Sequence, residues 1–136
     1  MIRFSTNFCA YRLAMGTFYD GTFLIFDLKS MSFVKTIRFP GEEYLWQFAR
    51  GGDGRLYAGT YPKGKLGALD LVNYQVEDFG NPAKPNMYCR EVSTLPDGRI
   101  YCRYGMQSRD LFIFDPKTKQ FSRAPSQTKN AYSTRR

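Results

Sequence analysis

The sequence predicts an all-β protein made of three repeated units, and three observations support this fold class. An Asp-Gly turn, a strand and a later strand ending in Asp recur roughly every 44 residues. Aromatic residues, which favour strands, make up 17% of the chain, with 12 Phe and 10 Tyr. We find no run of about ten or more residues with the apolar spacing of a helix. Repeats of this length are small modules that must stack on their neighbours to be stable.

The first unit is the least regular of the three. Residues 12–17 (RLAMGT) match the strand that follows the Asp-Gly turn in the other units, and residues 26–27 match the later strand end. Ala10-Tyr11 stands where the other units have Asp-Gly. Its innermost strand would have to be residues 2–6, so we expect that strand to be frayed or absent.

The middle unit shows the pattern most clearly. It predicts strands over residues 44–49, 56–60, 66–71 and 75–79. Asp53-Gly54 between two strand-like runs indicates a two-residue hairpin of type I′, in which both central residues have positive φ. The segment 61–64 (YPKG) then breaks the chain before the third strand.

The third unit predicts strands over residues 87–95, 99–104, 111–115 and 120–123. Its turn at residues 115–118 (DPKT) combines an aspartate that can accept backbone N–H bonds with a proline that fixes φ. The same spacing joins a strand-end aspartate to the next strand's apolar residue in every unit, at Asp27, Asp70 and Asp115. We therefore interpret these three aspartates as turn formers and not as a shared carboxylate site.

Four short antiparallel strands in a repeat of this length are the arrangement of a β-propeller blade. Residues 53–62 (DGRLYAGTYP), followed by the strand end at Leu69-Asp70, resemble bacterial β-propellers of the YVTN and NHL-like class. The resemblance covers about residues 12–125. It implies three blades, over approximately 1–40, 41–80 and 81–125, within one partial propeller at residues 1–125.

The resemblance is specific for a fold and not for an activity. Propellers of this kind include sugar-polymer lyases, lactonases, streptogramin-inactivating lyases and interaction scaffolds. The Trp-Asp signature of the eukaryotic repeat class is missing, because Trp46 is the single tryptophan and precedes Gln47.

Three blades leave two sheet faces without a neighbour, since a closed propeller needs at least about four. Exposing both faces to water would remove a sizeable part of the free energy of unfolding, which is about 5 to 15 kcal/mol for a typical domain. The chain could stand open, two copies could form a six-bladed ring, or further blades could belong to a longer propeller. We expect a homodimer or the remaining blades of a longer propeller as partner.

The net charge of +8 is concentrated at one end. Residues 1–115 hold 14 Lys/Arg and 12 Asp/Glu, whereas residues 116–136 hold six Lys/Arg and no acid. Residues 126–136 are polar and basic, and we expect them to form a disordered tail. A nucleic-acid surface needs basic residues on a folded face, so we do not expect a nucleic-acid partner.

The three cysteines predict neither a disulfide framework nor a zinc site. A two-residue loop at Asp97-Gly98 would place Cys102 opposite Ser93 and Cys89 opposite Met106, so we interpret both as buried apolar side chains. We expect no metal and no cofactor. We find neither a secretion signal nor a membrane span of about 20 apolar residues, which makes a soluble, cytoplasmic chain the default expectation.

The chain contains no histidine, which excludes His-based acid/base, metal and nucleophile chemistry from this segment. Gly51-Gly52-Asp53-Gly54 precedes a strand, so it is no phosphate-binding loop. Tyrosine as acid or base, with arginine holding a uronate carboxylate, remains possible. Propeller ligands usually bind where mid-blade and inter-blade loops gather. The mid-blade candidates are Tyr61, Lys63, Lys65, Arg103, Tyr104 and Arg109, and the inter-blade candidates are Glu42, Glu43, Lys84, Asn86, Tyr88 and Arg90.

Comparison of the repeats ranks these candidates. Tyr44 recurs as Tyr88, and Tyr57 as Tyr101, which indicates packing. Arg90 replaces Trp46 and Arg103 replaces Gly59, so both are better functional candidates. An ion pair with Glu91 or Asp110 is the competing interpretation for these arginines. Two adjacent carboxylates at residues 42–43 are weak support for a calcium site.

These observations lead to a first hypothesis and two alternatives. The first is a propeller scaffold that binds a carbohydrate or protein ligand and lacks a complete active site. The second is a lyase on acidic polysaccharides, completed by a second chain or further blades. In that lyase, Arg90 or Arg103 would bind the carboxylate and Tyr61 or Tyr104 would move the proton. In either case, the ligand-binding residues would be Lys63, Tyr61, Arg90, Arg103, Tyr104 and Arg109. The third is anion or nucleic-acid binding through the basic tail.

Overall fold

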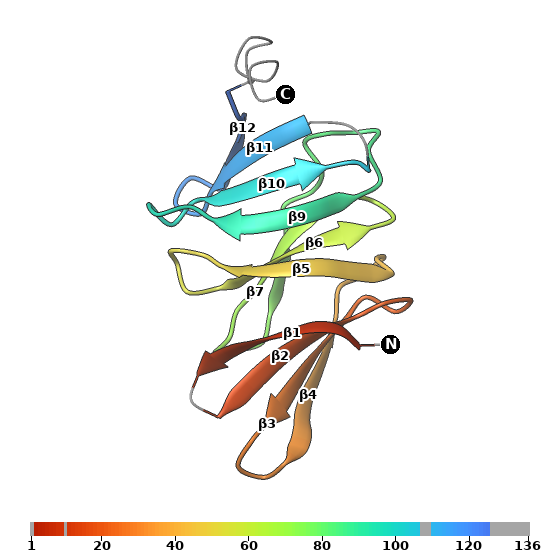
Figure 1. Ribbon diagram of the computed structural model, residues 1–136, viewed down its shortest axis with the longest axis vertical. Coiled ribbons are helices and arrows are strands. Elements are labelled where there is room, and N and C mark those ends of the chain that lie inside the picture. Colours follow the sequence, from red (N-terminus) through yellow and green to blue (C-terminus); the bar gives the residue numbers. More distant parts are fainter. Residues whose placement is uncertain (1, 10, 107–109, 126–136) are drawn as a thin grey trace, which may run out of the picture.

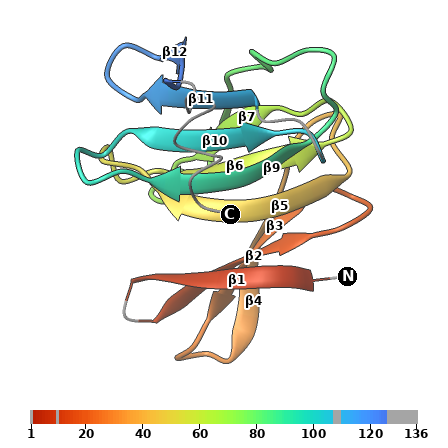
Figure 2. The ribbon, with the colours of Figure 1, turned by 45° about the horizontal axis from the view of Figure 1, so that its top comes forward.

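The chain folds into three four-stranded antiparallel sheets, each built from strands consecutive in sequence. The computed structural model describes residues 2–9, 11–106 and 110–125. Figures 1 and 2 show the three sheets following one another from the N-terminal to the C-terminal part of the chain. This architecture confirms the predicted all-β fold of three four-stranded blades.

Each blade runs from its first strand to its fourth without a crossover. Blade 1 consists of β1 (Ile2–Cys9), β2 (Arg12–Thr17), β3 (Thr22–Asp27) and β4 (Ser32–Arg38). Blade 2 consists of β5 (Tyr44–Arg50), β6 (Leu56–Tyr61), β7 (Leu66–Leu69) and β8 (Val76–Asp78). Blade 3 consists of β9 (Cys89–Thr94), β10 (Ile100–Tyr104), β11 (Asp110–Asp115) and β12 (Gln120–Arg123). Among the described residues, no helix is long and apolar enough to cross a membrane.

The expectation of a frayed or absent first strand was wrong. β1 spans Ile2–Cys9 and pairs with β2 from Ile2↔Thr17 to Cys9↔Arg12, with two irregularities in register. The backbone of β1 also lies against β5 of the next blade. Pairing along the whole of β2 therefore extends the innermost strand beyond the predicted residues 2–6.

The two Asp-Gly hairpins close with three-residue loops, and the predicted type I′ turns were wrong. In blade 2, Gly51 N donates to Arg55 O at 2.9 Å and Gly54 N donates to Gly51 O at 3.0 Å. Blade 3 repeats both bonds between Leu95, Gly98 and Arg99. Only the glycine of each Asp-Gly pair has a positive φ, +83° at Gly54 and +90° at Gly98. A type I turn followed by one left-handed residue makes this loop, so each aspartate keeps a negative φ.

The strand-end aspartates form turns, as predicted. Asp27 Oδ1 accepts bonds from the backbone N–H of Lys29 at 2.8 Å and of Ser30 at 3.1 Å. Asp70 makes the equivalent pair of bonds, and Asp115 Oδ1 accepts one from Lys117 at 2.9 Å. These backbone bonds hold the pKa of the Asp27 and Asp70 carboxyls below the usual value.

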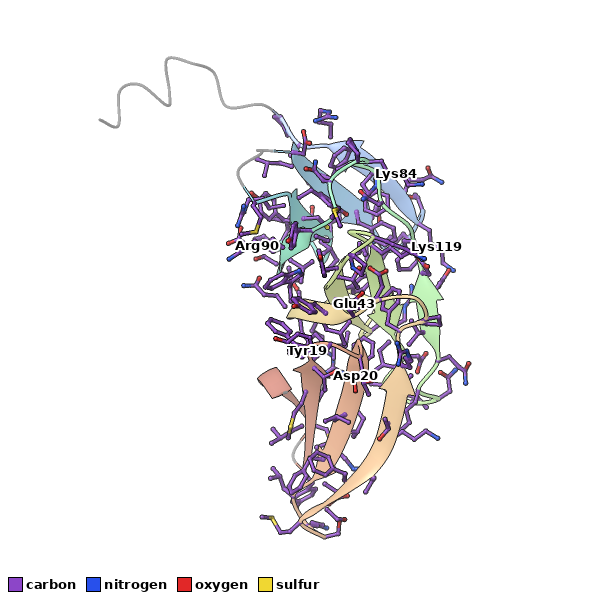
Figure 3. The ribbon with its side chains drawn as sticks, turned by 90° about the vertical axis from the view of Figure 1, so that its right-hand side faces the viewer. Tyr19, Asp20, Glu43, Lys84, Arg90 and Lys119 are labelled. Carbon is purple, nitrogen blue, oxygen red and sulfur yellow. The ribbon has the colours of Figure 1, made fainter. Side chains whose placement is uncertain are left out.

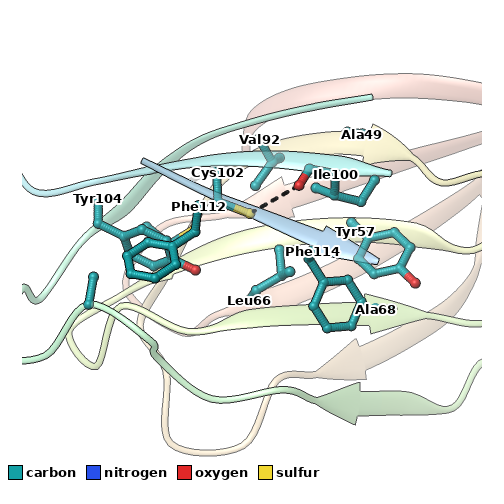
Figure 4. Close-up of a cluster of buried hydrophobic side chains, with 12 residues drawn as sticks. Ala49, Tyr57, Leu66, Ala68, Val92, Ile100, Cys102, Tyr104, Phe112 and Phe114 are labelled. Atoms are coloured by element: carbon teal, nitrogen blue, oxygen red, sulfur yellow. Dashed lines mark hydrogen bonds between the residues drawn. The ribbon is translucent and has the colours of Figure 1, made fainter. Parts of the chain in front are cut away.

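Two separate hydrophobic cores lie between successive blades. The core between blades 1 and 2 includes Phe23, Ile25 and Leu45, and the core between blades 2 and 3 includes Tyr57 and Phe114. Figure 4 shows the second core, with side chains from blades 2 and 3 meeting between the sheets. Blade 2 is therefore covered on both faces, whereas the described residues cover each end blade on one face.

The cysteine register differs from the prediction, although the predicted burial is confirmed. Cys89 and Cys102 are buried and free. Cys102 pairs with Val92 and Cys89 pairs with Tyr104. The three-residue loop moves the register by one residue, and an irregularity between Arg103 and Tyr104 moves it again at the far end of the hairpin.

Candidate functional site: an aromatic row across three blades

Six aromatic side chains form a continuous row along one end of the three blades. The residues come from all three blades: two directly follow β2 of blade 1, three lie in β5 and β6 of blade 2, and one directly precedes β9 of blade 3. Its members are Phe18, Tyr19, Tyr44, Trp46, Tyr61 and Tyr88. Below, "the aromatic row" refers to these six residues.

Neighbouring rings in the row are in direct contact. The Phe18 and Tyr44 rings stack with centroids 4.3 Å apart and planes 8° apart. The Tyr44 ring lies 4.9 Å from Tyr61, which stacks on Tyr88 at 4.7 Å and 23°. Trp46 joins the row beside Tyr44 at 5.4 Å and beside Tyr88 at 5.7 Å. Such contacts fix the rings relative to one another and connect the three blades.

Arg90 caps the row at blade 3. Its guanidinium lies 5.1 Å from the centroid of the Trp46 ring, and its Nη1 lies 2.6 Å from Met106 Sδ. Arg90 and Trp46 occupy equivalent positions in their repeats, so residues that differ between blades meet at the blade boundary. This cation–π contact accounts for the position of Arg90. Within the described part of the chain, Glu91 pairs with Arg103 and Asp110 with Arg123, and neither pairs with Arg90.

The row is half-buried and opens to solvent at its first-blade end. Tyr19 is 66% exposed, while Phe18, Tyr44, Trp46, Tyr61 and Tyr88 are half-buried. Figure 3 looks onto the right-hand side of Figure 1 and shows Tyr19 and Arg90 toward one edge, with Glu43 between them and Lys84 beyond. The rings therefore combine packing with accessible aromatic surface.

A pocket of about 350 Å³ lies beside the Tyr61–Tyr88 stack. It forms between the loop that follows Tyr61 and the loop that precedes Tyr88. Its lining consists of Pro62, Lys63, Lys65, Gly80, Asn81, Lys84, Pro85, Asn86 and Met87. Four of the predicted loop candidates, Lys63, Lys65, Lys84 and Asn86, thus come together in one pocket.

Glu42 is a fully buried carboxyl beneath the same loop. Its Oε2 accepts a hydrogen bond from the Thr60 hydroxyl and one from Lys63 N at 3.2 Å. Its Oε1 is buried without a hydrogen-bond partner among the described residues. Burial raises the pKa of Glu42, although the hydrogen bonds and the nearby lysines oppose this shift.

Arg103 and Tyr104 lie apart from the aromatic row. Arg103 pairs with Glu91 across the hairpin, which confirms the competing ion-pair interpretation. Tyr104 is 0% exposed within the core between blades 2 and 3 (Figure 4), and burial raises its pKa. The expectation that Tyr104 lies at a ligand-facing loop was wrong, because Ile100, Cys102 and Tyr104 alternate inward along β10. Arg109 lies outside the described residues, as does the predicted basic tail at residues 126–136.

Tyr61 is in the row, but its environment does not suit a base. Its neighbour Tyr88 and partial desolvation raise the pKa of the Tyr61 hydroxyl. A tyrosine that removes a proton near neutral pH needs its pKa lowered. Within the described residues, no group of three or more Cys, Asp or Glu side chains could hold a metal ion.

Sequence reasoning missed the contribution of residues 18–19 and Trp46 to the row. Phe18 and Tyr19 lie in the β2–β3 loop, where no repeat pattern singled them out. The replacement of Trp46 by Arg90 was the available signal for the blade boundary. Tyr44 and Tyr88 do pack, as their recurrence predicted, yet they pack within a surface that solvent can reach.

Comparisons with known proteins support the fold and no particular activity. No family model matches the chain, and no curated protein matches its sequence. Virginiamycin B lyase from Staphylococcus aureus matches structurally with a TM-score of 0.79 at 10% identity, over 96% of this chain and 43% of that one. Hydrazine synthase from Kuenenia stuttgartiensis matches with a TM-score of 0.73 at 13% identity, over 87% of this chain and 33% of that one.

A third solved structure is a β-propeller by its own description. The Cps50 (Swd1) β-propeller domain from Myceliophteria thermophila matches with a TM-score of 0.70 at 19% identity, over 98% of this chain and 41% of that one. At such identities the likeness shows the fold alone. The chain is a partial β-propeller of three blades, and it spans less than half the length of each of these structures.

Proposed function

We propose that this partial propeller is a ligand-binding scaffold without a complete active site of its own. The aromatic row carries the proposal, because it presents connected rings from all three blades at one end of the molecule. Tyrosine and tryptophan supply large contact areas at low entropic cost, and together with arginine they dominate many binding surfaces. Contact between the rings holds them in place before a ligand arrives, which lowers the cost of binding.

A carbohydrate suits this surface. The C–H face of a sugar ring can lie on an aromatic ring, while its hydroxyls reach polar groups at the edge. Tyr19, Tyr61 and Tyr88 combine an aromatic face with a hydroxyl, and Glu43 and Arg90 lie at the same end of the blades. The other candidate ligand, a protein segment, would use the same rings as anchors.

The alternative of a polysaccharide lyase has weaker support. Of its four proposed catalytic residues, Tyr104 is buried and Arg103 is paired with Glu91. Tyr61 lies in the row with its pKa raised, and Arg90 contacts the row at Trp46. Cleavage of a uronate polymer by elimination would create an ultraviolet-absorbing product, so a rise in absorbance with any such polymer would revive this alternative.

The apolar residues on the outer faces of the end blades are the reason to propose a partner for the scaffold. Side chains alternate along strands, so the residues opposite the core of blade 1 include Leu24 and Phe26, both half-exposed. The outer face of blade 3 likewise carries Tyr101, Leu111 and Ile113. We propose that a second copy of the chain, or further blades of a longer propeller, covers these faces.

Fluorescence of Trp46 tests the binding proposal, because this single tryptophan lies within the row. Titration with a panel of neutral and acidic oligosaccharides should change its emission in a saturable way. Tyr19→Ala and Tyr88→Ala should weaken binding about tenfold, because each removes an aromatic contact. Tyr11→Ala removes an exposed tyrosine outside the row and serves as the matched control. No saturable change with any oligosaccharide, or equal affinities for all three variants, would contradict the proposal.

A further inference from the structure

The pocket beside the Tyr61–Tyr88 stack has an unusual balance of charge. Its lining contains three lysines and neither aspartate nor glutamate. Lys65 Nζ is neutralised by Asp78 Oδ2 at 2.5 Å. Among the described residues, Lys63 and Lys84 have no carboxylate within ion-pair distance. Two positive charges therefore remain at the pocket without a fixed counter-ion.

Polar contacts shape this pocket from both of its loops. Asn81 Nδ2 donates to Lys63 O at 3.0 Å and to Asn86 O at 2.7 Å, which ties the two loops together. Asn81 Oδ1 accepts a bond from Ala83 N at 2.7 Å. Gly64 has φ +59°, and a Cβ atom there would lie 2.7 Å from Asn86 O, so the loops approach closely at a glycine. The pocket is thus fixed by internal bonds of the chain.

Two further carboxyls lie near the pocket. Glu42 is buried beneath the loop, where its Oε2 accepts bonds from the Thr60 hydroxyl and from Lys63 N. Asp110 accepts a bond from Asn86 Nδ2 at 2.7 Å and pairs with Arg123. The charges of Lys63 and Lys65 act on Glu42 without forming an ion pair with it, and among the described residues neither acid is ion-paired with Lys63 or Lys84.

We infer that this pocket binds an anionic group, the carboxylate or sulfate of an acidic glycan whose neighbouring sugar ring contacts the Tyr61–Tyr88 stack. The inference rests on the proposed binding function of the aromatic row and names its ligand class. Tyr61 directly precedes the lining residue Pro62, and Tyr88 directly follows the lining residue Met87. A ligand that spans pocket and stack must therefore carry its negative charge next to a ring, as a uronate or a sulfated sugar does.

The test compares a galacturonate hexamer with its methyl-esterified form, which keeps the rings and removes the charge. Trp46 emission should report binding of the acidic hexamer about tenfold tighter than of the ester at low salt, and the difference should shrink as salt is added. Lys63→Gln with Lys84→Gln should abolish this preference. Lys35→Gln with Lys117→Gln removes two exposed lysines outside the pocket and should preserve it.

Inorganic sulfate separates failure of the inference from failure of the proposed function. Sulfate should shift the amide resonances of Gly64 and Asn81 in the wild-type chain and not in the Lys63→Gln, Lys84→Gln variant.

Equal binding of acid and ester, with no sulfate shift, would overturn the inference and leave the function proposed for the aromatic row intact. Sulfate binding without any response of Trp46 to oligosaccharides would support the anion pocket and contradict the function proposed for the row. A polyglutamate peptide that binds as tightly as the hexamer would contradict the assignment to a glycan.

Discussion

The middle blade and the end blades place the same repeat position in different surroundings. Tyr57 of blade 2 is 0% exposed beneath blade 3, whereas its equivalent Tyr101 lies half-exposed on the outer face of the molecule. In the same way, every residue of β7 in blade 2 is buried, whereas the equivalent third strands β3 and β11 of the end blades each keep half-buried residues. The side chains of a blade are therefore suited to a neighbouring blade on each face, and within the described residues each end blade has one such neighbour.

The polar contacts between blades follow the same division. At the hairpin loops of blades 2 and 3, Gly52 N donates to Gly98 O at 2.9 Å and Thr94 Oγ1 donates to Arg50 O at 2.5 Å. These hydrogen bonds join blades 2 and 3 on the same side as the hydrophobic core between them. The outer faces of the end blades carry half-buried apolar side chains, among them Leu24 and Ile113.

The largest difference in the free energy of unfolding should appear when an apolar side chain is truncated on a covered face and, for comparison, on an uncovered face. Leu66→Ala, in the core between blades 2 and 3, should lower the free energy of unfolding by about 2 to 5 kcal/mol. Leu24→Ala, on the outer face of blade 1, should cost below about 1 kcal/mol in the isolated chain. Urea unfolding at low protein concentration measures both. Equal losses would mean that the faces do not differ as described.

Replacing the buried carboxyl of Glu42, at the junction of blades 1 and 2, should have the second-largest effect on the free energy of unfolding. Its repeat equivalent, Asn86, is neutral and half-buried, whereas Glu42 is fully buried with Oε1 unpartnered among the described residues. Glu42→Gln should therefore stabilise the chain at neutral pH by roughly 1 kcal/mol.

The pH dependence has a defined sign. The pKa of Glu42 is higher in the folded chain than in the unfolded chain. The contribution of this carboxyl to the free energy of unfolding is therefore fully present below the unfolded pKa, and it is lost as the pH rises through the folded pKa. The gain from Glu42→Gln should therefore grow from acidic to neutral pH in thermal unfolding. Glu43→Gln changes the exposed neighbour and is the control. A gain that stays constant with pH would contradict the burial argument.

Removing single hydroxyls should have the smallest effect. Tyr57 donates to Asp53 Oδ2 at 2.8 Å, within a cluster in which Arg55 pairs with both Asp53 and Glu77. Tyr57→Phe should cost about 0.5 to 1.5 kcal/mol. Tyr101→Phe, at the equivalent position on the outer face, should leave the unfolding free energy unchanged within measurement. An equal cost at both positions would remove the distinction between the blades.

The fold was predictable because its signals are local and repeated. Asp27, Asp70 and Asp115 each mark a turn at fixed spacing, and their backbone contacts are those the spacing implied. The loop type was not predictable from Asp-Gly alone, since type I′ and three-residue loops share that signature. The resulting register decided which residues face Cys89 and Cys102.

The candidate site was only partly predictable. The pocket forms between a mid-blade loop and an inter-blade loop, and Lys63 and Lys84 were among the candidates from these two kinds of loop. The aromatic row depends on contacts between blades, so Phe18 gave no sign of its role, and Trp46 gave only its replacement by Arg90 at the equivalent repeat position. Tyr104 could have been assigned to the core, because inward-facing residues alternate along its strand.

The mass of the isolated chain in solution tests most directly whether the outer blade faces require a cover. Sedimentation over a range of concentrations should show association, with a discrete species at twice 15.7 kDa if a second copy closes the ring. A charge on an outer face, as in Leu24→Lys, should weaken that association without unfolding the chain. A cooperatively folded monomer that persists at high concentration would contradict the account.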